Sequence, residues 1–176
     1  MGRLTHPFDL IANNRGNIAT ASAEFGVPQE AIGSIILKEQ FTQSLPDQLS
    51  MLVNAVLPGE RTRYTATVGL GAISVRSAQT AWSEYEQEFQ VPGPDFLGND
   101  NKMLDELTHD DNFQVQTIAV MLLYNGSQDA KLDPHTAMSW TNADWRETLH
   151  GYNSIKGYDY ADKVLQYFGP MKTFLS

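Results

Sequence analysis

VPQEAIGSIILKEQ, residues 27–40, is the stretch around which the whole chain can be interpreted. Its proline falls in a first helical turn, where the missing N–H would have no partner in any case, and Gln29 and Glu30 suit the positive end of the helix dipole. The apolar residues that follow cover more than one helical face: Ala31, Ile32, Ile35, Ile36 and Leu37. We expect a helix over residues 27–40 that neighbouring segments bury on several sides.

The last turn of this predicted helix carries a lone acid, Glu39, at the edge of the core. Next to Lys38, an exposed glutamate at a helix end would be ordinary surface chemistry. A buried helix that ends in an acid would instead indicate a functional carboxyl group. Both interpretations stay open on this stretch alone, and other segments must decide between them.

The rest of the chain predicts a mainly α fold in one domain over residues 1–176, a length that suits one sizeable core. Residues 58–74 are the exception, because their glycines and β-branched residues favour a loop or short strands. Residues 7–25 predict one or two helices that stop at Gly26. Further helices are expected over residues 47–57, 76–90, 102–108, 112–125, 142–149 and 158–168, with Asp110 or Asp111 and Thr141 or Asn142 as N-caps.

Composition excludes several classes of protein. The formal net charge of −9 argues against nucleic acid as the main partner, because a phosphate backbone calls for a basic surface. No apolar run approaches the roughly 18 residues of a membrane span. The chain has no cysteine, and its histidines (His6, His109, His135 and His150) lack the spacing of metal ligands, so we expect neither a metal nor a cofactor.

Two segments carry the first signs of a glycan cleft. The predicted core helix ends in Leu37-Lys38-Glu39-Gln40, and a glycine-rich turn follows further along, Thr67-Val68-Gly69-Leu70-Gly71-Ala72-Ile73, leading through Ser74 into Val75-Arg76-Ser77-Ala78. A helix that closes on a glutamate and is followed by such a turn is the arrangement of a lysozyme-type cleft.

Two later segments extend this pattern in the same order. Leu107 to Asn112 leads into the apolar run FQVQTIAVMLL, and Gly151-Tyr152-Asn153-Ser154 precedes YADKVL (residues 160–165) and Tyr167-Phe168. Over residues 27–168 the chain therefore resembles the lysozyme-like superfamily, in particular its branch of lytic transglycosylases and goose-type lysozymes. The resemblance implies a lysozyme-like α+β fold whose small β or irregular segment lies beside the active-site cleft.

The resemblance implies that Glu39 is the catalytic acid for a β-1,4 glycosidic bond. An apolar surrounding from Ile35, Ile36 and Tyr152 would raise the pKa of Glu39 and keep it protonated near neutral pH. Because no second acid has a clear nucleophile position, the implied route is transglycosylation, in which the substrate's N-acetyl group assists and an anhydro sugar forms. Hydrolysis stays open as the alternative.

The implied substrate-binding residues lie in the turn and near the Tyr-Asn pair: Thr67, Gly69, Leu70, Ser74, Tyr152, Asn153 and Glu60. Tyr152 and Asn153 could instead be a buried tyrosine and a helix cap. Glu60 and Asp47 are the nearest further acids, and either could be plain surface charge.

Departures from the family pattern leave the activity open. Ala72 stands where the family usually has a glutamine that touches substrate, and Gly71 and Val75 replace the usual methionine and proline. The main expectation is a peptidoglycan-cleaving enzyme. The negative charge favours a chitin- or chitosan-type glycan as an alternative, and the missing glutamine favours a lysozyme-fold module that binds glycan or protein without catalysis.

The expected partners are a glycan polymer and, as a further class, a protein inhibitor or immunity partner, with the chain itself a monomer. The resemblance implies action at the cell wall, in the periplasm or outside the cell. The first residues lack the apolar run of a secretory signal, so the localisation stays open.

Overall fold

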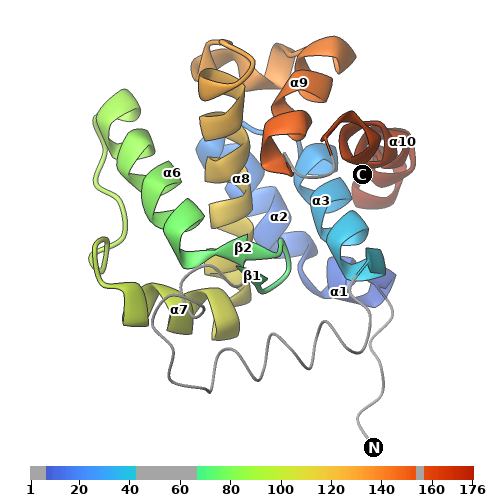
Figure 1. The fold of residues 1–176 in the computed structure, drawn as a ribbon. Helices are drawn as coiled ribbons and strands as arrows, with labels where there is room; N and C mark the ends of the chain where they lie inside the picture. Colours follow the sequence, from blue (N-terminus) through green and yellow to red (C-terminus); the bar gives the residue numbers. More distant parts are fainter. Residues whose placement is uncertain (1–6, 43–66, 154–156) are drawn as a thin grey trace, which may run out of the picture.

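The computed structural model describes residues 7–42, 67–153 and 157–176, which are mainly helical with one small antiparallel sheet (Figure 1). This confirms the predicted mainly α class with a small β segment. The elements in chain order are α1 (Pro7–Asn13), α2 (Arg15–Phe25), α3 (Gln29–Thr42), β1 (Thr67–Val68), β2 (Ile73–Ser74), α6 (Val75–Phe89), α7 (Asp100–His109), α8 (Asp111–Gln128), the 3₁₀ helix η1 (Pro134–Ser139), α9 (Asn142–Tyr152) and α10 (Gly157–Leu175).

Helix α8 is the centre of the core, and α2, α6 and α9 pack around it (Figure 1). Apolar residues on all of its faces are fully buried, including Val115, Ile118 and Leu122. The Asp110 side chain caps its first turn by accepting from the backbone N–H of Phe113, as the sequence predicts. A helix buried on every side needs no polar face, which explains its continuous apolar run.

Helix α3 packs closely against α10. Gly33 permits this approach, because a Cβ at that position would lie 2.8 Å from the Met171 Cγ. The predicted burial on several sides is confirmed, since Ile32, Ile35 and Ile36 have no exposed surface. The helix begins at Gln29 rather than at residue 27.

Several helix ends differ from the prediction, and those of α8 and α10 are the clearest cases. We expected Asn125-Gly126-Ser127 to end α8, but the helix continues to Gln128 because Gly126 sits under the Trp140 ring and its backbone stays helical. We also expected the last helix to end near Phe168. It continues through Pro170 to Leu175, because Met171 and Leu175 are buried and anchor the final turns.

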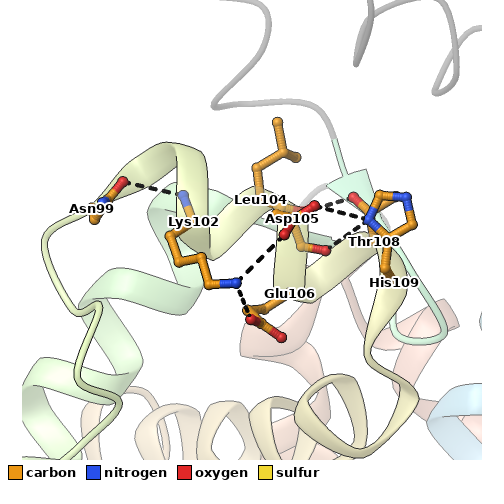
Figure 2. Close-up of polar contacts among 7 residues, drawn as sticks. All are labelled: Asn99, Lys102, Leu104, Asp105, Glu106, Thr108 and His109. Atoms are coloured by element: carbon orange, nitrogen blue, oxygen red, sulfur yellow. Dashed lines mark hydrogen bonds and ion pairs between the residues drawn. The ribbon is translucent and has the colours of Figure 1, made fainter.

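The two strands form a short hairpin in which Thr67 pairs with Ser74 and Val68 with Ile73. Helix α7 supports this hairpin from below, against β1. Figure 2 shows how α7 is stabilised: Asn99 caps its start by accepting from the Lys102 N–H, and the Lys102 ammonium lies 2.6 Å from the Glu106 carboxylate. The ion pair is exposed to solvent, so its contribution is modest.

The helix predicted over residues 47–57, together with Asp47 and Glu60, lies outside the described residues. Among the described residues, no helix has the length and apolar character to cross a membrane.

Candidate functional site

Glu39 is buried in the last turn of α3, with 6% of its surface exposed. Its neighbour Lys38 is equally buried, at 5%. Interpreting Glu39 as an exposed surface residue is therefore wrong. A carboxyl group removed from water in this way needs specific surroundings, because burial disfavours its charged form.

Two tyrosines provide those surroundings. Tyr152 is the last residue of α9 and Tyr160 lies in the first turn of α10; their rings are parallel, with centroids 6.2 Å apart. Burial raises the pKa of both hydroxyls well above the usual value, and the Glu39 carboxylate raises the pKa of both further. The Glu39 carboxyl group therefore lies beside both rings, at the junction of three helices.

The two hydroxyls differ in how they are satisfied. The Tyr152 hydroxyl donates to the carbonyl of Gly71 at 3.0 Å. The Tyr160 hydroxyl lies close to Glu39, whose charge and hydrogen-bonding contact both raise the pKa of that hydroxyl, although the contact falls short of full hydrogen-bond geometry. The Lys38 ammonium lies 5.6 Å from the centre of the Tyr160 ring, and Tyr160 thus faces both charged residues at the end of α3.

The turn between β1 and β2 is fixed in place by side chains from three helices. The Gln40 amide donates to the carbonyl of Leu70 at 3.2 Å, and the Gln114 carbonyl accepts from the Leu70 N–H at 2.7 Å. Tyr152 bonds Gly71 from the other side. The hairpin is therefore anchored to α3, α8 and α9 at once. Its anchor on α3, Gln40, directly follows Glu39 in the sequence.

Both glycines of this turn are required by close packing. Gly69 has a φ of +73°, and a Cβ there would lie 2.6 Å from the carbonyl oxygen of Leu107 and from the Gln114 side chain. A Cβ at Gly71 would lie 2.6 Å from Ile118 and 2.9 Å from the Tyr152 hydroxyl. A side chain at either position would push the hairpin off α8 and break the bonds that hold it.

A hollow of about 190 Å³ opens beside the hairpin. Hydroxyl and amide groups from β1, β2, α6 and the end of α9 line it together with apolar surface, a mixture that suits a sugar ring. The lining residues are Thr67, Ala72, Ile73, Ser74, Ser77, Met121, Tyr152 and Asn153.

A second hollow of about 450 Å³ lies between α6, α8 and α9. It shares Ser77, Met121 and Tyr152 with the first, so the two hollows adjoin; together we call them the groove. Glu39 lines neither hollow, but its carboxylate acts on Tyr152, which lines both.

The structure brings most of the predicted site residues together. Thr67, Ser74, Tyr152 and Asn153 line the first hollow, and Asn153 is also the C-cap residue of α9. Gly69 and the buried Leu70 position the hairpin and do not line this groove. Glu60 lies outside the described residues.

The sequence analysis assigned no role to three residues of the site: Gln40, Gln114 and Tyr160. Gln40 follows the acid directly, and Tyr160 opens the YADKVL segment, so the motifs contained both residues without indicating what they touch. Gln114 had one available signal, because it is a polar residue on an otherwise apolar helix and is 3% exposed. Such a residue is expected to bond a buried backbone group.

The described residues contain no group of three or more His, Asp or Glu side chains that could hold a metal ion. No family model matches the chain, and no curated protein or solved structure matches it either. The chemistry of the site must be inferred from its own residues.

Proposed function

We propose that this protein cleaves a β-1,4-linked cell-wall glycan, with peptidoglycan as substrate and Glu39 as the general acid and base. One observation carries the proposal: the buried Glu39 carboxyl group acts on Tyr152, which bonds the glycine hairpin and lines the hydroxyl-bearing hollow beside it. The order of motifs along the chain, which resembles lytic transglycosylases, supports the same conclusion. The fold alone would not, because one fold can host many functions.

The surroundings of Glu39 support a role in proton transfer. The buried Glu39 carboxyl group would donate a proton to the leaving oxygen as the glycosidic bond breaks. Tyr160 would act as a positioning residue, since it packs against the end of α3 and faces this carboxyl group. The Thr67 and Ser74 hydroxyls, with Asn153, would bind sugar hydroxyls in the groove.

No second acid in the described part of the chain acts on the tyrosine pair, which favours a substrate-assisted route. Among the described residues, Glu39 is the only carboxylate that raises the pKa of Tyr152 or Tyr160. A two-carboxylate mechanism needs a partner within roughly 5–9.5 Å. In the proposed route Glu39 protonates the leaving oxygen, the N-acetyl oxygen bonds to C1, and the Glu39 carboxylate then takes the proton of the C6 hydroxyl. That hydroxyl attacks C1, releases the N-acetyl oxygen and closes an anhydro sugar.

Purified protein incubated with wall sacculi tests this proposal, with the soluble products analysed by mass. Anhydro sugar ends are expected, and Glu39→Gln should lower product formation by at least about 100-fold, since a general acid typically contributes 10²–10⁴-fold. Glu30→Gln, the same substitution in the first turn of the same helix, is the matched control and should leave activity unchanged. Reducing ends in place of anhydro ends would assign hydrolysis. Full activity in Glu39→Gln would contradict the proposal.

A second candidate is a glycan-binding module without catalysis, and Ala72 favours it. Ala72 lines the groove with a methyl group where a polar side chain could contact the sugar. In this case sacculi would bind the protein and stay intact. Assaying chitosan and chitin in parallel separates both candidates from a hydrolase of a less acidic glycan, which the net charge of −9 would suit.

A further inference from the structure

A narrow slot lies between α6 and α8, which pack against each other (Figure 1), where residues 81–89 meet residues 120–128 and Pro134. It shares Tyr124 with the second hollow of the groove and no lining residue with the first. The slot has a volume of about 40 Å³, and one water-sized group needs about 10–15 Å³. It therefore has room for a chain of about three heavy atoms and not for a sugar ring, so the proposed cleavage leaves it without a role.

Aromatic rings and aliphatic side chains make up much of the lining of the slot. Tyr85 and Phe89 on α6 stack on each other, with ring centroids 4.5 Å apart, and Tyr124 adds a third ring from α8. The buried Val120 and Leu123 add aliphatic surface. Such a lining favours an alkyl chain because it removes apolar surface from water, and aromatic rings also attract a nearby cation.

Two carboxylates, Glu84 and Glu88, line the same slot from successive turns of α6. Like charges at this spacing on a helix repel each other. No lysine or arginine of the described residues lines the slot. The Glu88 carboxylate lies 3.5 Å from the His135 imidazole, which carries a charge only when it is protonated. The pair of carboxylates therefore lacks a permanent cation beside it in the described part of the chain.

The end of α6 adds to the negative potential around the slot. The carbonyl end of a helix carries a partial negative charge, and the last turn of α6 has no basic residue to offset it. At the end of α8, by contrast, the Lys131 ammonium donates to the Gln128 carbonyl. Burial raises the pKa of the Tyr85 hydroxyl, and the Glu24 carboxylate raises it further. The groups around this apolar slot therefore favour a positive charge.

We propose that this slot binds a small primary alkylamine, with its unbranched alkyl tail inside and its ammonium group at the open side. The tail would pack against the rings and Leu123, and the ammonium would lie beside Glu84 and Glu88. Both glutamates are exposed, and the Glu88 side chain is 52% exposed, so the ammonium would keep part of its hydration. The opposite orientation would move the charge away from water at a high cost.

NMR titration of the full chain with butylamine at neutral pH tests this inference without any glycan substrate. The backbone amide signals of residues 81–89 and 120–128 should shift and saturate. Butanol, which has the same alkyl chain without the charge, should bind at least about fivefold more weakly. Glu84→Gln and Glu88→Gln should each lower the affinity for butylamine about two- to fivefold, the range of an exposed ion pair. Glu30→Gln removes the same charge from α3 and is the control, with unchanged affinity.

Two further amines test the orientation of the ligand. Diaminobutane carries a second ammonium at the other end of the chain, and N-acetyl-lysine methylamide carries a peptide backbone there. Both should bind at least about tenfold more weakly than butylamine, because each would bring polar groups into the apolar part of the slot. Equal binding of either compound would overturn the assignment to an alkylamine with its tail inside. Unsaturable shifts with butylamine, equal binding of butanol, or an affinity that both glutamine variants leave unchanged would overturn the site itself.

Discussion

Tyr152 and Tyr160 form a matched pair for a substitution experiment, because one hydroxyl is bonded and the other is not. The Tyr160 ring is buried and the Tyr152 ring is partly buried against the same core, the two rings are parallel, and Glu39 raises the pKa of both hydroxyls. The Tyr152 hydroxyl donates to the Gly71 carbonyl, whereas the Tyr160 hydroxyl, close to the Glu39 carboxylate, reaches full hydrogen-bond geometry with no described residue. Replacing each by phenylalanine removes one oxygen and keeps the ring, so the two variants isolate the hydroxyl.

The two substitutions should change stability in opposite directions. Tyr160→Phe removes an unsatisfied buried hydroxyl, whose desolvation costs about 1–3 kcal/mol, and should raise the free energy of unfolding by about 1 kcal/mol. Tyr152→Phe removes a formed bond and leaves the buried Gly71 carbonyl without that donor, so it should lower the free energy of unfolding by about 1 kcal/mol or more. For a chain of this size, 1 kcal/mol corresponds to roughly 2–4 °C in Tm.

Thermal and urea unfolding of the wild type and both variants measure this difference. The expected separation between the variants is about 2 kcal/mol, or roughly 4–8 °C in Tm. If Tyr160→Phe loses as much stability as Tyr152→Phe, the Tyr160 hydroxyl has a hydrogen-bond partner in solution, with the Glu39 carboxylate as the first candidate. The description of Tyr160 as unsatisfied would then be wrong.

Further predictions concern pH, one helix cap and one glycine. Tyr152 and Tyr160 have raised pKa values in the fold and ordinary values near 10 in the unfolded chain. The stability that depends on their neutral form is therefore fully present below about pH 10 and is lost as the pH rises above it. Tyr160→Phe should make the alkaline loss of stability shallower, by up to about 1.4 kcal/mol per pH unit once the pH exceeds the ordinary tyrosine pKa near 10. Urea unfolding between about pH 9 and 11 measures this slope, and an unchanged slope would contradict the prediction. Thr141→Ala removes the capping box at the start of α9 and should cost about 0.5–2 kcal/mol by thermal unfolding, and no loss would show that the cap is dispensable. Gly126→Ala would drive a Cβ into the Trp140 ring and should destabilise by about 1–3 kcal/mol, whereas Gly16→Ala on α2, with nothing within 4 Å, should gain up to about 1 kcal/mol. Equal effects at the two glycines would contradict the packing at Trp140.

The helical class could be predicted from the sequence because its signals are local. The Asp110 and Thr141 caps act within one turn, and the αL conformation of Gly26 ends α2 where a glycine is expected to do so. The errors occurred where distant contacts override a local signal. Gly126 would usually favour a helix end, but the Trp140 ring packs onto it and the helix continues.

The residues of the candidate site also fall into those that the sequence could indicate and those that only distant contacts reveal. Glu39 could be singled out from the sequence, because an acid at the end of an apolar helix is unusual and the segments that follow it keep a recognisable order. The assignment of Gly69 and Leu70 to substrate contact did not anticipate their position, since the sequence cannot tell a glycine that meets a ligand from one that packs against Leu107. Sequence spacing also gave no sign that Arg76 and Asp129 share a hollow.

The sequence by itself determined the helical class and singled out Glu39 as a candidate, because helix propensity and apolar periodicity are properties of neighbouring residues. Only the tertiary structure decided that Glu39 is buried, that Tyr152 and Tyr160 face it, and that the hairpin is held by Gln40 and Gln114. Those contacts join residues far apart in the chain, and only the packing of the helices brings them into reach of one another.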